Sequence, residues 1–165
     1  MPSDIEHVEQ AQHNLTFLQS FCSVYKFNDW ATTVAFYSAI HIVEAVIYKK
    51  KRLLYLGKEI DIEHASDFPK ALQKAELLPP KGLKRTPHAY REILIRQNFT
   101  DVQAAYKILN TECGNARYKY YICPDEVIKE KILPQLKVII VWGESQLSSK
   151  FVFENEKHEG TSKIN

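Results

Sequence analysis

The stretch that decides the fold is DWATTVAFYSAIHIVEAVIY, residues 29–48. Apolar side chains recur around nearly every face of a helix drawn through it, whereas a helix at a protein surface carries one apolar stripe. The pattern therefore predicts a central, buried helix that has Asn28 as its N-cap and Trp30 in the core. Small side chains such as Ala31 and Ala35 share one side, which predicts that a second helix approaches closely there.

Further helices are predicted on both sides of this one. Ser3 with Glu6, and Thr100 with Gln103, have the spacing of a capping box, in which each side chain satisfies a free backbone N–H at a helix start. Together with apolar periodicity, such caps predict helices over residues 4–26, 87–97 and 125–147, and one that starts at Thr100.

Two segments are less regular. Residues 53–86 predict only a short helix over residues 66–77, followed by a proline-containing loop, so we expect an insertion here. The run KVIIVW, residues 137–142, looks like a strand, but no second strand-like run exists to pair with it, and an isolated strand is not stable. We therefore predict a long helix that is kinked around Pro134.

Composition supports an all-α fold in one compact domain. The 165 residues are 45% hydrophobic and 25% charged, which is typical of a chain with a single core. Only 5 glycines are present, too few for the many tight turns of a β-sandwich or barrel. We expect one domain over residues 1–152, an up-down bundle of four to five helices, and a polar, flexible tail over residues 153–165.

The same composition bears on location and cofactors. The three cysteines are an odd number without a CxxC spacing, so we expect reduced thiols rather than disulfides or a cysteine-rich zinc site. The N-terminus lacks an apolar core of signal-peptide length, and the run around residues 136–142 is shorter than the roughly 20 residues needed to cross a bilayer. We expect a cytoplasmic protein without membrane contact and, because no phosphate-binding glycine loop is present, without a cofactor.

Several segments resemble small prokaryotic proteins of the HEPN (higher eukaryotes and prokaryotes nucleotide-binding) family. These are DWATTVAFYSAIHIVEA at residues 29–45, TPHAYREI at 86–93, with its His-x-x-Arg pattern, and AAYKILNTECGNARY at 104–118. With the first helix, the similarity covers about two-thirds of the chain. The resemblance implies a helical bundle of four or five helices, frequent homodimerisation, and roles in RNA cleavage, toxin–antitoxin pairs and defence against foreign nucleic acid.

The ribonuclease branch of that family uses an arginine followed by a histidine after about four to six residues, with two copies meeting across a dimer. No arginine of this chain has a histidine at that distance. Histidine and arginine can nevertheless cleave RNA without a metal wherever the fold brings them together, because they supply a proton acceptor, a proton donor and a cation. We take Arg117 and His88 as the candidate catalytic pair.

Two segments predict nucleic-acid contacts. Arg117 is followed by Tyr118 and Lys119, and such a mixture of cations and flat rings is typical of surfaces that bind single strands. Tyr118 could instead be a core residue, and Arg117 could pair with a carboxylate. The second segment, residues 81–96, is rich in cations, among them Lys84, Arg85, Arg91 and Arg96. If this segment lies beside Lys49–Arg52, the two together form a basic face that attracts phosphates. His88 and Arg91 share a helix face, as either a functional pair or a surface pair that fixes the loop.

Tyr37, His41 and Glu44 form a polar stripe on the central helix, where a buried helix should be apolar. A buried histidine hydrogen-bonded to Tyr or Glu explains this stripe, and a catalytic base is the alternative. His41 and Glu44 are too few ligands for a metal, so no metal site is predicted.

The sequence favours a HEPN-like module that binds RNA, a nucleotide or an operon-encoded partner protein through a basic face. The alternatives are a dimeric, metal-independent ribonuclease with an unusual Arg/His site and a structural dimer or scaffold. An arginine and a histidine in one cleft would favour the enzyme, and a basic face without a convergent pocket would favour binding.

Overall fold

A computed structural model describes residues 1–22, 27–119 and 123–153, and these residues are predominantly helical. The elements in chain order are α1 (Asp4–Cys22), α2 (Asn28–Lys50), β1 (Arg52–Tyr55), β2 (Lys58–Asp61), the 3₁₀ turn η1 (Ala65–Asp67), α3 (Phe68–Lys74), α4 (Pro87–Asn98), α5 (Thr100–Tyr118), the π-helical turn η2 (Val127–Ile132) and α6 (Leu133–Leu147).

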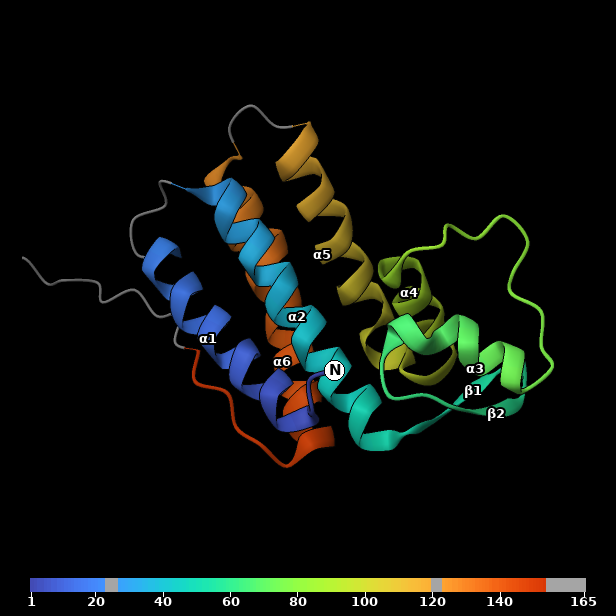
Figure 1. The fold of residues 1–165 in the computed structure, drawn as a ribbon. Coiled ribbons are helices and arrows are strands. Elements are labelled where there is room, and N and C mark those ends of the chain that lie inside the picture. The colour runs from blue at the N-terminus through green and yellow to red at the C-terminus, as the bar shows by residue number, and fades with distance from the viewer. Residues whose placement is uncertain (23–26, 120–122, 154–165) are drawn as a thin grey trace, which may run out of the picture.

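Four of these helices form an up-down bundle. Figure 1 shows α1, α2, α5 and α6 running alternately up and down, with α3, α4 and the strands grouped beside them. The central helix is α2, which contacts α1, α5 and α6. Its approach to α6 is close, because a Cβ added at Gly143 would lie 2.3 Å from Cγ2 of Ile42. The prediction of a helical chain built around residues 29–48 is confirmed.

The first half of α2 differs from the prediction in two respects. Trp30 is 59% exposed rather than in the core, because it lies where α2 borders a surface groove beside the end of α5. Asn28 is not the N-cap: the cap position is Phe27, and the Asn28 side chain instead donates to the Cys123 carbonyl at 3.0 Å and to Asp125 at 2.7 Å. Asn28 therefore ties the start of α2 to the segment before α6.

Of the two capping boxes predicted for other helices, one is present and one is absent. The capping box of Ser3 and Glu6 is confirmed, with Ser3 N–H donating to Glu6 at 2.7 Å. Thr86 also caps α4, accepting from the Ala89 N–H at 3.3 Å. The box predicted for Thr100 is wrong, because Phe99 precedes the helix and no side chain caps it.

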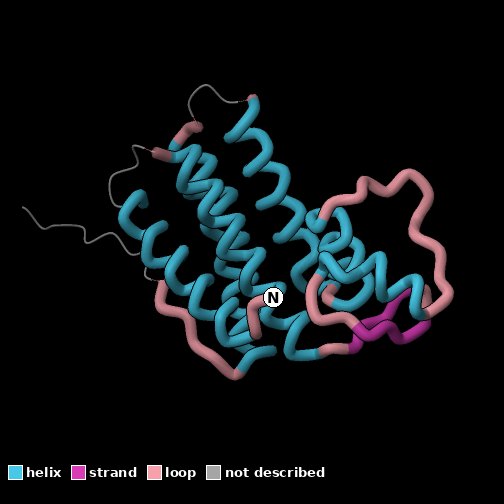
Figure 2. The backbone as a smooth tube through the Cα atoms, viewed as in Figure 1, coloured by secondary structure: helices cyan, strands magenta, loops and turns pink. Residues whose placement is uncertain are grey.

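The β-hairpin was not predicted. Lys51 adopts a left-handed conformation, with φ of 57°, which ends α2 and directs Arg52 into β1. Tyr55 then pairs with Lys58 across a two-residue turn in which Leu56 and Gly57 both have positive φ. The hairpin lies apart from the four-helix bundle (Figure 2), and Asn98 at the end of α4 accepts from the Leu54 N–H.

The helix predicted over residues 125–147 is present, with an irregular turn where Pro134 was expected to kink it. The π-helical turn η2 precedes Pro134, and the Leu133 N–H bonds five residues back to the Ile128 carbonyl. A proline lacks the N–H for a normal helical bond, and the wider turn accommodates this loss. Phe153, where the tail was expected to begin, packs against the core, and residues 154–165 lie outside the described residues.

One helix of the described residues, α2, is long and apolar enough to cross a membrane, and 72% of that apolar window is buried inside the protein. The core helix of a soluble protein meets the same criteria of length and composition.

Candidate functional site

A buried cluster of polar side chains lies where α1, α2, η1, α4 and α5 meet. We call it the polar cluster, and its members are His7, His41, Glu44, His64, Arg91 and Tyr106. Burying so many polar groups is costly unless they bond to one another, so their arrangement is specific rather than incidental.

The centre of the cluster is an ion pair between α2 and α4. Glu44 is 4% exposed and Arg91 6% exposed, and the Arg91 Nε–H donates to Glu44 Oε1 at 2.8 Å. Arg91 also donates to the Tyr106 hydroxyl at 3.4 Å, while the Ala65 N–H donates to the second carboxylate oxygen at 3.1 Å. The pair therefore joins α2 to α4, α5 and the start of η1.

These contacts fix the ionisation states at the centre. Burial alone would raise the pKa of Glu44, but hydrogen bonds and the charge of Arg91 outweigh it and lower that pKa to about 2. Burial raises the pKa of Tyr106 to about 12, so its hydroxyl stays neutral at neutral pH. Glu44 is thus a carboxylate and Tyr106 a neutral phenol.

Three histidines extend the cluster toward α1 and η1. The Nδ1 atoms of His7 and His41 are 3.0 Å apart, and His7 Nε2 is 3.4 Å from His64 Nδ1. Burial lowers the pKa of His7 to about 4, and burial followed by the charge of Arg91 lowers the pKa of His41. His7 and His41 are therefore neutral at pH 7 and carry lone pairs that can accept a proton or bind a metal.

His88 links the cluster to the surface. Its Nδ1 lies 3.5 Å from Arg91 Nη1, its ring stacks on Phe36, and the residue as a whole is exposed. Burial of the ring lowers the pKa of His88, and the charges of Arg91 and Arg117 lower it further, against a raising effect of Glu92. The candidate catalytic residues His88 and Arg117 thus lie close enough to interact electrostatically.

A groove of about 470 Å³ lies between the start of α2 and the end of α5. We call it the Arg117 groove, and it is lined by Asp29, Trp30, Thr33, Tyr37, Ala116, Arg117 and Tyr118. Arg117 lies over the Tyr118 ring, 5.2 Å from its centre, and Tyr118 is 77% exposed, so it is not a core residue. No carboxylate of the described residues forms a salt bridge with Arg117.

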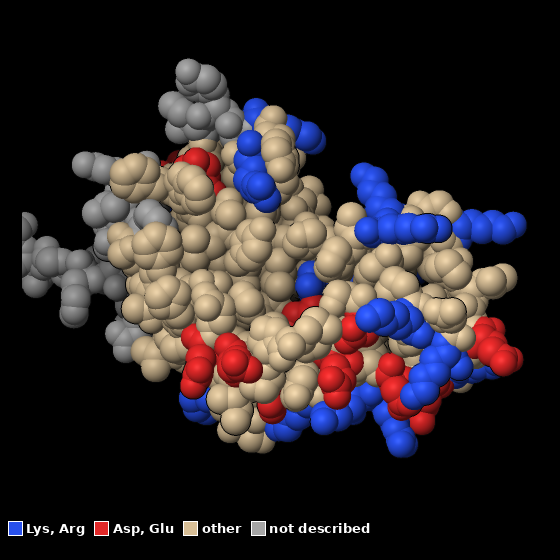
Figure 3. All heavy atoms as spheres, viewed as in Figure 1, with Lys and Arg blue, Asp and Glu red and all other residues tan. Residues whose placement is uncertain are grey.

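The predicted basic face is divided. Arg91 is buried against Glu44, so it is not available as a surface contact. Arg52 is 3.6 Å from Asp61 and Lys51 is 4.0 Å from Glu63, which reduces the positive charge of that run. Figure 3 shows basic side chains gathered at the end of α5 and along the loop between α3 and α4, whereas both signs alternate where β1 and β2 lie. The exposed predicted cations of these two regions are Arg117, Lys119, Lys84 and Arg85.

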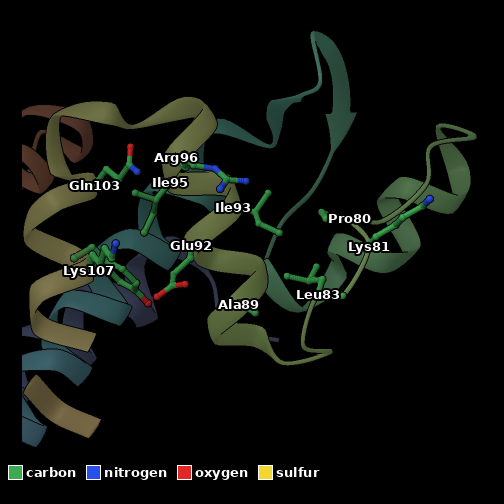
Figure 4. A pocket seen from close by; sticks show the side chains of 12 residues that line it. Pro80, Lys81, Leu83, Ala89, Glu92, Ile93, Ile95, Arg96, Gln103 and Lys107 are labelled. Atoms are coloured by element: carbon green, nitrogen blue, oxygen red, sulfur yellow. The ribbon is translucent and has the colours of Figure 1, made fainter. Parts of the chain in front are cut away.

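Arg96 lies in a second pocket, of about 400 Å³, between α4, α5 and the loop around residues 80–83. Figure 4 shows that Lys81 lies across α4 from Lys107, and that Glu92 is among the lining residues. These cations do not converge on one point, so the pocket offers no focused anion site.

The structure therefore brings together some of the predicted residues. His41 and Glu44 join the polar cluster, although His41 bonds to His7 rather than to Tyr or Glu, and Tyr37 lies in the Arg117 groove. No pattern in the sequence singled out His7 or His64, and Tyr106 lies in the segment AAYKILNTECGNARY without having been singled out. No protein-family model, curated protein or solved structure matches the chain.

Proposed function

We propose that this protein is a HEPN-like module that binds single-stranded RNA in the Arg117 groove. The observation that carries the proposal is an exposed arginine, free of carboxylate partners among the described residues, lying over an exposed tyrosine in a groove with two more exposed aromatic rings. A guanidinium binds a phosphate, and flat rings stack on bases of any sequence.

The groove also has one acidic side chain, Asp29. Its carboxylate repels phosphates, so the strand would place a phosphate at Arg117 and its bases over Trp30 and Tyr37. Lys119, which follows α5, adds a second exposed cation beside Arg117. A homodimer and a role in a defence or toxin–antitoxin system are parts of the same proposal and rest on the family resemblance. The proposed cytoplasmic location rests on the composition of the sequence.

A second candidate function is metal-independent RNA cleavage. It is favoured by the position of His88, whose pKa is lowered by burial of the ring and further by the nearby charges of Arg91 and Arg117. A neutral histidine can accept the proton of a 2′-hydroxyl while an arginine stabilises the phosphate. Cleavage thus requires the strand in the Arg117 groove to reach His88.

Arg117→Ala should weaken the binding of a labelled single-stranded RNA about 10-fold and reduce the salt dependence of binding by about 0.7 in log–log slope, because one phosphate contact is lost. Trp30→Ala and Tyr37→Ala should each cost about 1–3 kcal/mol of binding free energy, because each removes a ring on which a base stacks. Fluorescence anisotropy at several salt concentrations measures both effects.

Lys58→Ala is the matched control, since it removes one positive charge from β2, away from the end of α5 (Figure 1). Equal weakening of RNA binding by Lys58→Ala and Arg117→Ala would contradict binding in the Arg117 groove and would indicate unspecific electrostatic attraction. The same mixtures, incubated with a chelator and resolved on a denaturing gel, test the second function. Cleavage that is lost in His88→Asn would support it, and intact RNA would exclude it.

A further inference from the structure

The contact between His7, His64 and Glu44 is unusual for a hydrogen-bonded network. His7 Nε2 is 3.4 Å from His64 Nδ1, and His64 Nδ1 is 3.6 Å from a carboxylate oxygen of Glu44. Both distances exceed the roughly 2.9 Å of a good N–H···O hydrogen bond. One ligand atom from each of the three residues lies within 4.8 Å of the other two. Atoms that bear lone pairs thus converge without bonding well to one another.

We propose that His7 Nε2, His64 Nδ1 and Glu44 Oε2 form a binding site for a zinc ion. Zinc bonds of about 2.0–2.1 Å to nitrogen and oxygen in a tetrahedron place neighbouring ligand atoms about 3.3–3.4 Å apart. The distances of 3.4 and 3.6 Å lie near that spacing, and the third pair of ligand atoms lies within 4.8 Å. An octahedral ion with bonds of the same length would bring neighbouring ligands to about 3.0 Å, which fits less well.

The surroundings orient each ligand as metal sites require. His7 contacts His41 through Nδ1 at 3.0 Å, and with His7 as the donor its Nε2 keeps a lone pair for the ion. Arg91 holds the other oxygen of Glu44, Oε1, so Oε2 is directed toward the histidines. The Ala65 N–H also donates to Oε2 at 3.1 Å and fixes its position.

The ring of His64 is buried beside these ligand atoms. The residue is 4% exposed, and its Nε2 is buried without a hydrogen-bond partner among the described residues. An ion at Nδ1 would leave the ring proton on Nε2 and would replace the long contacts of Nδ1 to His7 and Glu44 with a metal bond.

Two histidines and one carboxylate form the ligand set of several catalytic zinc sites, in which a fourth position binds water or substrate. The ligands come from α1, α2 and the residue before η1, so the ion would also connect the first helix to the segment after the hairpin. We expect zinc to bind only the folded protein and thereby to stabilise it against unfolding.

The test is a titration of the metal-free, full-length protein with Co²⁺, which takes zinc's ligands and absorbs visible light strongly when four-coordinate. One equivalent should produce that absorption, and one equivalent of Zn²⁺ should abolish it and raise the melting temperature. His7→Ala and His64→Ala should each lose the absorption, while His41→Ala should weaken binding about 10- to 100-fold, because it removes only the group that orients His7.

His13→Ala is the matched control, because His13 is an exposed histidine of the same helix as His7 and should leave binding unchanged. Circular dichroism of each variant shows whether it has folded. The titration of the unsubstituted protein decides the matter independently of the variants. Absence of saturable, one-to-one Co²⁺ and Zn²⁺ binding, or equal losses from His13→Ala and His64→Ala, would overturn the proposal.

Discussion

Replacing Arg91 with Met should lower the free energy of unfolding by about 3–5 kcal/mol, because the Glu44 carboxylate would stay buried without its cation. Globular proteins have total stabilities of about 5–15 kcal/mol, so this one side chain accounts for a large share. The single variant also leaves the Tyr106 hydroxyl without its partner. Urea unfolding of the metal-free protein at pH 7.5 measures the loss.

The double variant Glu44→Leu, Arg91→Met should recover most of that stability, because replacing a buried ion pair with apolar side chains is often close to neutral. Lys74→Met is the control: it breaks an exposed ion pair with Asp61 and should cost less than about 1 kcal/mol. If Arg91→Met costs no more than Lys74→Met, the Glu44–Arg91 pair is solvated and our description of the polar cluster is wrong.

The metal-free protein should lose about 3 kcal/mol of stability between pH 7 and pH 4 through His7 alone. Burial lowers the pKa of His7 from 6.5 to about 4, so below pH 6.5 the unfolded chain binds a proton that the folded chain does not. The contribution of His7 to the free energy of unfolding is therefore fully present above pH 6.5. It falls as the pH approaches 4, at about 1.36 kcal/mol per pH unit.

The lowered pKa of His41 acts in the same direction. Glu44, with its pKa lowered from 4.5 to about 2, adds a further loss as the pH falls from about 4.5 toward 2. Urea unfolding at pH 7.5, 6.0, 5.0 and 4.5 measures the slope, and His7→Asn should flatten it while His13→Ala leaves it unchanged. A stability that is constant down to pH 5 would show that His7 accepts a proton in the folded protein.

How far the sequence predicts this fold depends on the kind of signal. Apolar side chains on nearly every face identified α2, because a helix at the centre of a bundle is covered by neighbours on several sides. The hairpin was not predicted because its turn is Leu56–Gly57 rather than Asn-Gly, and because both strands are short. Trp30 was misplaced because periodicity identifies apolar positions but does not show where a neighbouring helix stops covering them.

The candidate site shows a similar division. Glu44 on an otherwise apolar helix is a signal, because a buried carboxylate needs a cation, and Arg91 had been noted for another reason. His7 and His64 could not be predicted to meet, since they are 57 positions apart and no local pattern connects them. Contacts between such distant residues follow from the packing of whole helices, which short motifs do not encode.

The most direct test of RNA binding in the Arg117 groove uses the fluorescence of Trp30. The chain has 2 tryptophans, and Trp142 is 8% exposed beside Phe99, so Trp142→Phe leaves Trp30 as the sole reporter. Titration of that variant with single-stranded RNA should quench Trp30 in a saturable, salt-sensitive manner as bases stack on its ring, and adding Arg117→Ala should weaken the quenching about 10-fold. Trp30 emission that stays unchanged at saturating RNA would contradict the account.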